Sequence, residues 1–171
     1  MKKILLAVIC MTLVFNSIAF AGVGTNKAAF QGGTEKEQFF PNSKKPVEGT
    51  LNTSDEKLLK FTYKLGREEK VYAIPYDRII DLEYGQKAGR RVGAAIATAI
   101  LLSPLGLFLL FSKKRKHFVT IGYKDDADKE QVAVFELGKG IVRTTLPILE
   151  ARSGKKIEYQ DENARKSSKG N

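Results

Sequence analysis

Residues 48–154 predict an α+β, mainly β fold of about six strands followed by one helix. Polar and apolar residues alternate over several short stretches, which is typical of strands with one buried face. Turn-forming residues separate these stretches, and residues 139–153 change to helical spacing. A long apolar stretch interrupts the pattern between residues 86 and 116.

The first residues, 1–21, have the pattern of a signal peptide. Two lysines precede an apolar stretch at residues 4–15, and Ala19-Phe20-Ala21 matches a small-residue cleavage site. We therefore expect cleavage after Ala21 and export across the inner membrane into the cell envelope. Cys10 is the only cysteine and leaves with this peptide, so the mature protein has no disulfide or thiol chemistry.

Residues 22–47 are polar and aperiodic, which predicts a linker. The predicted strands at residues 59–65, 80–84 and 119–123 alternate with a period of two. Residues 71–74 and 132–137 follow turn-like stretches and are predicted as strands that pair back on the preceding ones. Together with residues 48–51 they account for the six strands.

Residues 139–153 predict a helix that ends at Gly154. Pro147 lacks a backbone donor, so the helix is either kinked there or begins near Thr145. Residues 155–171 end in charged and small residues and predict a flexible basic tail.

Several of these stretches resemble bacterial PH-like and GRAM-like domains, as found in exported bacterial proteins with an apolar insertion. The resemblance rests on "EGTL" at 48–51, "VYAIPYDRIIDLEYG" at 71–85, "HFVTIGY" at 117–123 and "VAVFELG" at 132–138, and it covers about residues 48–154. It implies a PH-like bent antiparallel sheet closed at one end by the C-terminal helix, with a binding or scaffolding role and no catalysis. Asp55 and Glu56 stand in the loop where a basic cluster would bind phosphoinositides, so no such site is carried over.

The apolar insertion, residues 86–116, contains twenty consecutive uncharged residues from Val92 to Phe111, of which fifteen are Ala, Val, Ile, Leu or Phe. As one helix it would span about 30 Å, the thickness of a bilayer core. A single crossing would put the two halves of the predicted sheet on opposite sides of the membrane. Ser103-Pro104-Leu105-Gly106 has turn chemistry near the middle, which favours an inserted apolar helical hairpin. A single-pass helix and a segment buried in the protein stay open as alternatives.

The hairpin interpretation assigns two sets of residues. Basic residues flank the segment on both sides and are expected to contact anionic headgroups: Lys87, Arg90, Arg91, Lys113, Lys114, Arg115 and Lys116. The larger apolar side chains are expected to insert into the membrane: Val92, Ile96, Ile100, Leu101, Leu102, Leu105, Leu107, Phe108, Leu110 and Phe111.

The charge balance agrees with an anionic partner. The chain carries a net charge of +10, and removing Lys2 and Lys3 leaves 27 basic and 19 acidic residues, or +8. Membrane lipids are the expected partner, while a protein partner and an oligomer built on the apolar segment are left open. The basic flanks lack interleaved aromatics, so we expect no nucleic-acid binding.

No catalytic motif is visible in the sequence. His117 is the only histidine and has no cysteine, serine or carboxylate arranged around it by motif. We therefore expect no enzymatic activity, no metal and no cofactor.

Overall fold

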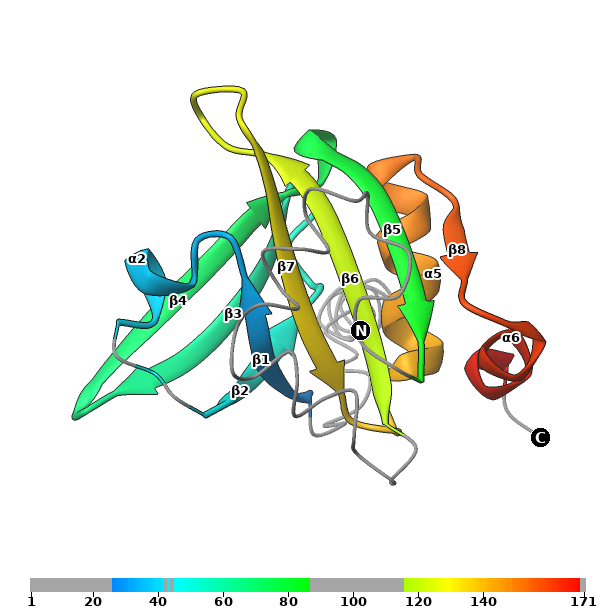
Figure 1. The fold of residues 1–171 in the computed structure, drawn as a ribbon, viewed down its shortest axis with the longest axis horizontal. Coiled ribbons are helices and arrows are strands. Elements are labelled where there is room, and N and C mark those ends of the chain that lie inside the picture. The colour runs from blue at the N-terminus through cyan, green and yellow to red at the C-terminus, as the bar shows by residue number, and fades with distance from the viewer. Residues whose placement is uncertain (1–25, 42, 44, 87–115, 170–171) are drawn as a thin grey trace, which may run out of the picture.

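The structure, a computed structural model, describes residues 26–41, 43, 45–86 and 116–169 (Figure 1). Eight strands form one sheet: β1 (Lys27–Gly33), β2 (Val47–Asn52), β3 (Leu58–Leu65), β4 (Glu68–Pro75), β5 (Ile79–Gly85), β6 (His117–Lys124), β7 (Glu130–Leu137) and β8 (Ile157–Tyr159). The described helices are α2 (Lys36–Phe39), the 3-10 turn η1 (Tyr76–Arg78), α5 (Val142–Ser153) and α6 (Glu162–Lys169).

The predicted fold class is wrong in two respects. The sheet has eight strands in the order β4-β3-β2-β1-β7-β6-β5-β8, where about six were expected. It is mixed, because β8 pairs in parallel with β5 while the other neighbours are antiparallel. The described residues contain only short helices, and the expected apolar helical hairpin at residues 92–111 lies outside them. The architecture is therefore not the expected PH-like bent sheet of six strands.

The structure also corrects the predicted domain boundaries. β1 lies within the expected linker, 22–47, and pairs with both β2 and β7 in the middle of the sheet. Phe40 from the same stretch is buried and stacks on Phe30, with ring centroids 4.1 Å apart. The expected flexible tail, 155–171, contains β8 and α6, which bury Ile157 and Ala164. The ordered unit is therefore longer than residues 48–154 at both ends.

Alternating burial explains the expected strand β3. In β3 the side chains of Leu59, Phe61 and Tyr63 are buried, while the residues between them are less buried. Its partner β4 follows a two-residue turn at Gly66, whose φ of +66° is left-handed and suits glycine. The pattern predicts a hairpin here, and the structure contains one.

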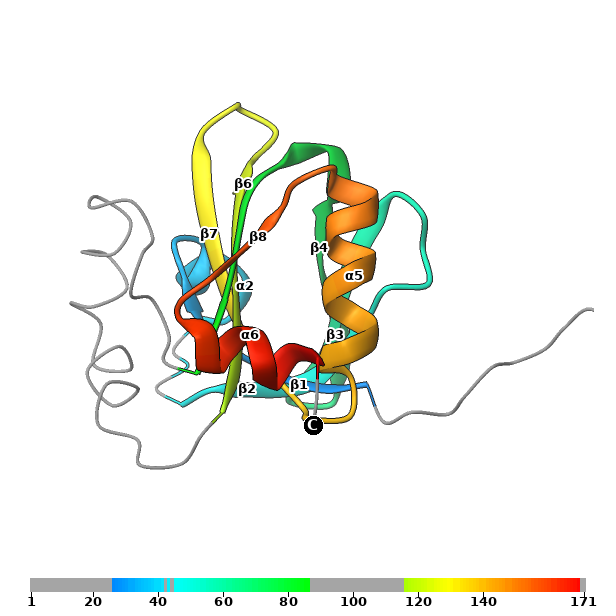
Figure 2. The ribbon, with the colours of Figure 1, turned by 90° about the vertical axis from the view of Figure 1, so that its right-hand side faces the viewer.

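The core lies between the sheet and α5, which runs along one side of it (Figure 2). α5 buries Leu146 and Leu149 against the sheet. Arg152 holds the helix to the β2–β3 loop by donating to the backbone oxygens of Thr53 and Asp55, and its guanidinium lies over the Tyr76 ring. Away from the helix, aromatic rings fill the space, with Phe135 in contact with Phe30, Phe61 and Tyr72.

α5 also settles the question that Pro147 raised. The helix begins at Val142, so Pro147 lies in its interior and is exposed. It ends where expected, since Gly154 has a φ of +69° and its N–H donates to the Glu150 carbonyl over 3.0 Å.

Candidate functional site

The chain enters and leaves the apolar segment from neighbouring strands. β5 ends at Gly85, β6 begins at His117, and the two strands are antiparallel with Gly85 opposite Phe118. The described residues on either side of 87–115 therefore lie close together at the same end of the sheet, the lower end in Figure 1. We call this place, made of Gly85, Gln86, Lys116 and His117, the insertion root.

Several contacts fix the β5 side of the insertion root. A Cβ at Gly85 would come within 1.8 Å of the Gln160 side chain, so a larger residue at position 85 would force that side chain to move. The Gln160 N–H donates to the Tyr84 carbonyl over 3.0 Å. The parallel pairing of β8 with β5 adds support from the outside edge. The strand that leads into the segment is thus held in place up to its last residue.

The β6 side of the insertion root carries a hydrogen-bonded ion pair. Lys116 Nζ lies 2.8 Å from Glu136 Oε2, and about a third or less of either side chain is exposed. Gln31 Nε2 donates to the same carboxylate oxygen over 2.6 Å. Lys116 was expected to contact headgroups, but its ammonium is already paired with a carboxylate of β7.

His117 joins the insertion root to α6. Its Nδ1 lies 2.5 Å from the Tyr84 hydroxyl, which is also 3.4 Å from Ser167 Oγ. Burial lowers the pKa of His117, and the nearby Lys139 lowers it further, while Glu136 acts in the opposite direction. The neutral ring is therefore favoured, and its Nδ1 can accept the Tyr84 proton. Burial raises the pKa of Tyr84, which keeps that hydroxyl protonated.

Lowering the pH should therefore reduce the stability of the folded protein, because His117 is protonated more readily in the unfolded chain. Its pKa in the folded protein lies below the ordinary value of 6.5, so the unfolded chain binds more protons than the folded one below that pH. The free energy of unfolding should fall as the pH drops from 6.5 through the folded pKa. Urea unfolding at a series of pH values tests this, and His117→Asn should show a shallower fall in that window. Equal slopes for the two proteins would contradict it.

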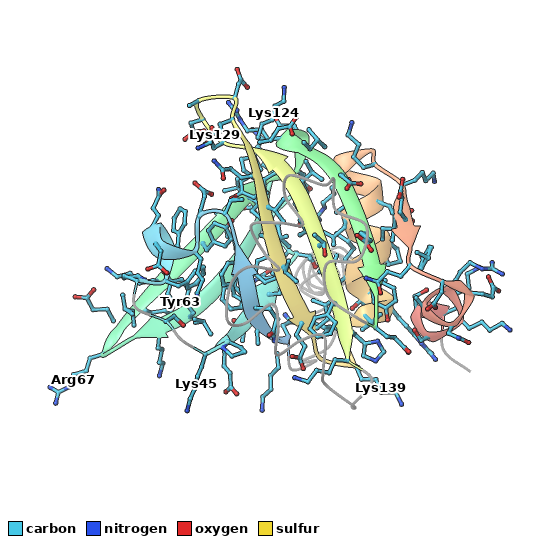
Figure 3. All side chains as sticks on the ribbon, viewed as in Figure 1. Lys45, Tyr63, Arg67, Lys124, Lys129 and Lys139 are labelled. Carbon is cyan, nitrogen blue, oxygen red and sulfur yellow. The ribbon has the colours of Figure 1, made fainter. Side chains whose placement is uncertain are left out.

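Further lysines lie at the same end of the molecule as the insertion root. In Figure 3, Lys45 and Lys139 point toward this end, and Lys124 and Lys129 lie at the opposite end. Lys27 is next to Lys139, because the N–H of Gly138 donates to the Lys27 carbonyl over 2.9 Å. Lys27, Lys45 and Lys139 could not be grouped from the sequence, since they are far apart in the chain.

Most of the residues predicted to act at a membrane lie outside the described ranges. This holds for all ten residues that were expected to insert into the membrane, and for Lys87, Arg90, Arg91, Lys113, Lys114 and Arg115. Lys116 alone is described, and its membrane role stays a prediction. Within the described ranges, no helix is long and apolar enough to cross a membrane. The same ranges contain no group of three or more side chains suited to bind a metal ion.

No protein family, curated protein or solved structure matches this chain. The insertion root and the lysines around it are therefore the features on which a functional proposal can rest.

Proposed function

We propose that the protein is a non-enzymatic module of the cell envelope, exported by its signal peptide and held at a membrane by residues 92–111. The apolar segment enters the bilayer and returns to the same side, and the folded sheet stays outside as a binding surface. The observation that carries this proposal is the pairing of Gly85 with Phe118, which brings both ends of the segment together.

This pairing favours a return to the same side over a single crossing. β5 and β6 are adjacent strands of one sheet, and β6 continues the sheet into β7 and β1. A single crossing would put β6 on the far side of the bilayer and break the β5–β6 ladder. The unpaired backbone groups of both strands would then have to be satisfied elsewhere, at a cost for each group.

The charge around the insertion root supports an anionic surface as the partner. The predicted cations Lys87, Arg90, Arg91 and Lys113–Arg115 directly flank the segment, and Lys45 and Lys139 add charge from the folded part. Each lysine near an anionic membrane contributes about 1 kcal/mol, less at high salt. The lysines at the opposite end are too far from the surface to contribute, because screening limits the effect to about 8 Å at physiological salt.

Removing two lysines at the same end of the molecule as the insertion root should therefore weaken binding to anionic vesicles. The double variant Lys45→Gln and Lys139→Gln should lose about fivefold in affinity per lysine at low salt. The matched control, Lys124→Gln and Lys129→Gln, removes the same charge from the other end and should bind like the unchanged protein. Vesicle co-sedimentation measures both, and equal losses would mean that net charge alone governs binding.

Cell fractionation tests the proposed function itself. Membranes from cells that express the tagged protein are washed first with high salt and then with carbonate. The proposal expects the protein to stay with the membranes through both washes. Release by salt alone would show that the basic residues act without insertion, and the proposal would fail.

A further inference from the structure

The turn between β3 and β4 carries an exposed apolar side chain. Gly66 and Arg67 form this turn, and Leu65, the last residue of β3, precedes it. Leu65 is 44 % exposed, and Val71 on β4 is the one other large hydrophobic residue that is exposed within the described ranges. We call residues 64–67 the hairpin tip.

The charges at the hairpin tip suit an anionic surface. Lys64 and Arg67 are both exposed, and no carboxylate of the described residues forms an ion pair with Arg67. The ammonium of Lys70 lies 2.7 Å from a Glu68 carboxylate oxygen and lowers the pKa of that carboxyl, so the negative charge of Glu68 is offset by a neighbour. With Glu69, this end of the hairpin has three basic and two acidic residues, a net charge of +1.

Further apolar groups adjoin Leu65. A shallow hollow of about 220 Å³ lies next to it and is lined in part by Pro41, Val47 and Tyr63. Pro41 is exposed and Val47 is half-buried. Leu65 is therefore part of a small apolar patch, and the cations of the hairpin tip border this patch.

The hairpin tip lies at the same end of the molecule as the insertion root. In Figure 1 the β3–β4 turn, the end of β5 and the start of β6 all lie at the lower end. Figure 3 shows Arg67 at this end together with Lys45 and Lys139, while Lys124 and Lys129 lie at the opposite end. A flat surface that meets the insertion root can therefore also meet the hairpin tip.

We propose that the hairpin tip is a second membrane contact, at which Leu65 enters the interface of an anionic bilayer and Lys64 and Arg67 contact its headgroups. This inference rests on the proposed function, because the insertion root decides which end of the protein faces the membrane. Held at two separate places, the folded sheet has a fixed orientation. The β6–β7 loop, at the opposite end, is then directed away from the bilayer.

The side chains of the hairpin tip suit the layers of a membrane interface. Leu65 leaves water when its side chain enters the apolar layer, which is favourable. The long side chain of Arg67 keeps its charge among the headgroups while its stem lies along the apolar groups. Gly66 has a φ of +66°, so the turn is tight, and its backbone groups stay at the level of the headgroups, where water can satisfy them.

An introduced tryptophan tests the contact, because the chain has no tryptophan of its own. Leu65→Trp is made in the full chain and mixed with vesicles of phosphatidylcholine and anionic phosphatidylglycerol. Its fluorescence emission should shift to shorter wavelength and be quenched by brominated lipids. The control is Ala127→Trp, which places the same reporter at an exposed position of the β6–β7 loop and should show neither change. If Leu65→Trp does not fold, Leu65→Cys in a Cys10→Ser background carries a polarity-sensitive dye at the same position.

The affinity of the protein for these vesicles gives a second readout. Leu65→Ser should bind about fivefold more weakly, and the loss should persist at high salt because an apolar contact is not screened. Val71→Ser removes a similarly exposed apolar side chain from within β4 and should lose less affinity. Equal losses for the two variants in vesicle co-sedimentation would overturn the assignment to the hairpin tip.

The same vesicles separate this inference from the proposed function. If the protein binds them and the emission of Leu65→Trp does not change, the membrane role stands and the second contact fails. If the protein does not bind them at all, the proposed function fails and this inference fails with it. A short-wavelength emission that is already present without vesicles would show that protein covers the tip, for example a second copy of the chain, and would also overturn the inference.

Discussion

Deleting residues 92–111 should release the protein from membranes completely. Because Gly85 and Phe118 lie opposite each other, a short Gly-Ser bridge between Arg91 and Ser112 can close the gap without moving β5 or β6. The basic flanks remain in this variant, but without insertion they give only salt-sensitive attachment. After a high-salt wash, flotation on a density gradient should find the unchanged protein with the membranes and the deletion variant at the bottom.

Flotation also distinguishes membrane-bound protein from an aggregate, because an aggregate does not float with the lipid. A second variant keeps the length of the segment and replaces Leu101, Leu102, Leu107 and Phe108 by serine. It should be released in the same way. Either variant floating with the membranes after the salt wash would show that residues 92–111 are not the anchor.

Truncating Phe135 should cause the largest loss of stability among single core substitutions. Phe135 is 1 % exposed on β7, and its ring contacts Phe30, Phe61 and Tyr72 from three other strands. Phe135→Ala should lower the free energy of unfolding by about 3–5 kcal/mol, because it removes the buried ring and leaves a cavity. This is a large part of the stability of a domain of this size, which is typically about 5–15 kcal/mol.

Urea unfolding would measure that loss, with Phe135→Ala made both in the full chain and in the variant that lacks residues 92–111. Val71→Ala is the matched control, since Val71 is 51 % exposed and should change stability by no more than about 0.5 kcal/mol. A Phe135→Ala protein that unfolds at the same urea concentration as the control would mean that the aromatic cluster does not hold the sheet together.

β3 could be located from the sequence because one of its faces meets the core and the other is less buried, which gives a period of two. β4 has no such alternation and was located as the partner of β3 after a turn-like stretch. β1 could not be found in this way. Its register shifts between Phe30 and Gly32, and Gln31 is buried as well as Phe30, so no alternation is visible in "KAAFQGG".

The C-terminal elements β8 and α6 were missed for other reasons. β8 has only three residues and needs β5 as its partner, and such a short strand has no pattern of its own. The ordered tail could have been suspected from Ala164 and Ser168, which are four residues apart and both buried in α6. The expected sheet of six strands was too small because β1 was counted as part of a linker and β8 as part of a flexible tail.

One part of the candidate site could be predicted from the sequence, and the other part could not. The apolar segment and its charged flanks are contiguous, so composition alone identifies them. The lysines near the insertion root and the Lys116–Glu136 pair depend on which strands are neighbours. The adjacency of Gly85 and Phe118 also depends on the order of the strands in the sheet. It favours a segment that returns to the same side of the membrane over a segment that crosses the membrane once.

The most direct test asks on which side of the membrane the two flanks of the segment lie. In a Cys10→Ser background, Lys87→Cys and Lys113→Cys are made separately and treated with a membrane-impermeant maleimide in sealed vesicles that contain the protein. The account predicts that both positions react to the same extent before the vesicles are opened, or that both react only afterwards. Reaction of one position in sealed vesicles and of the other only after opening would show a single crossing and contradict the account.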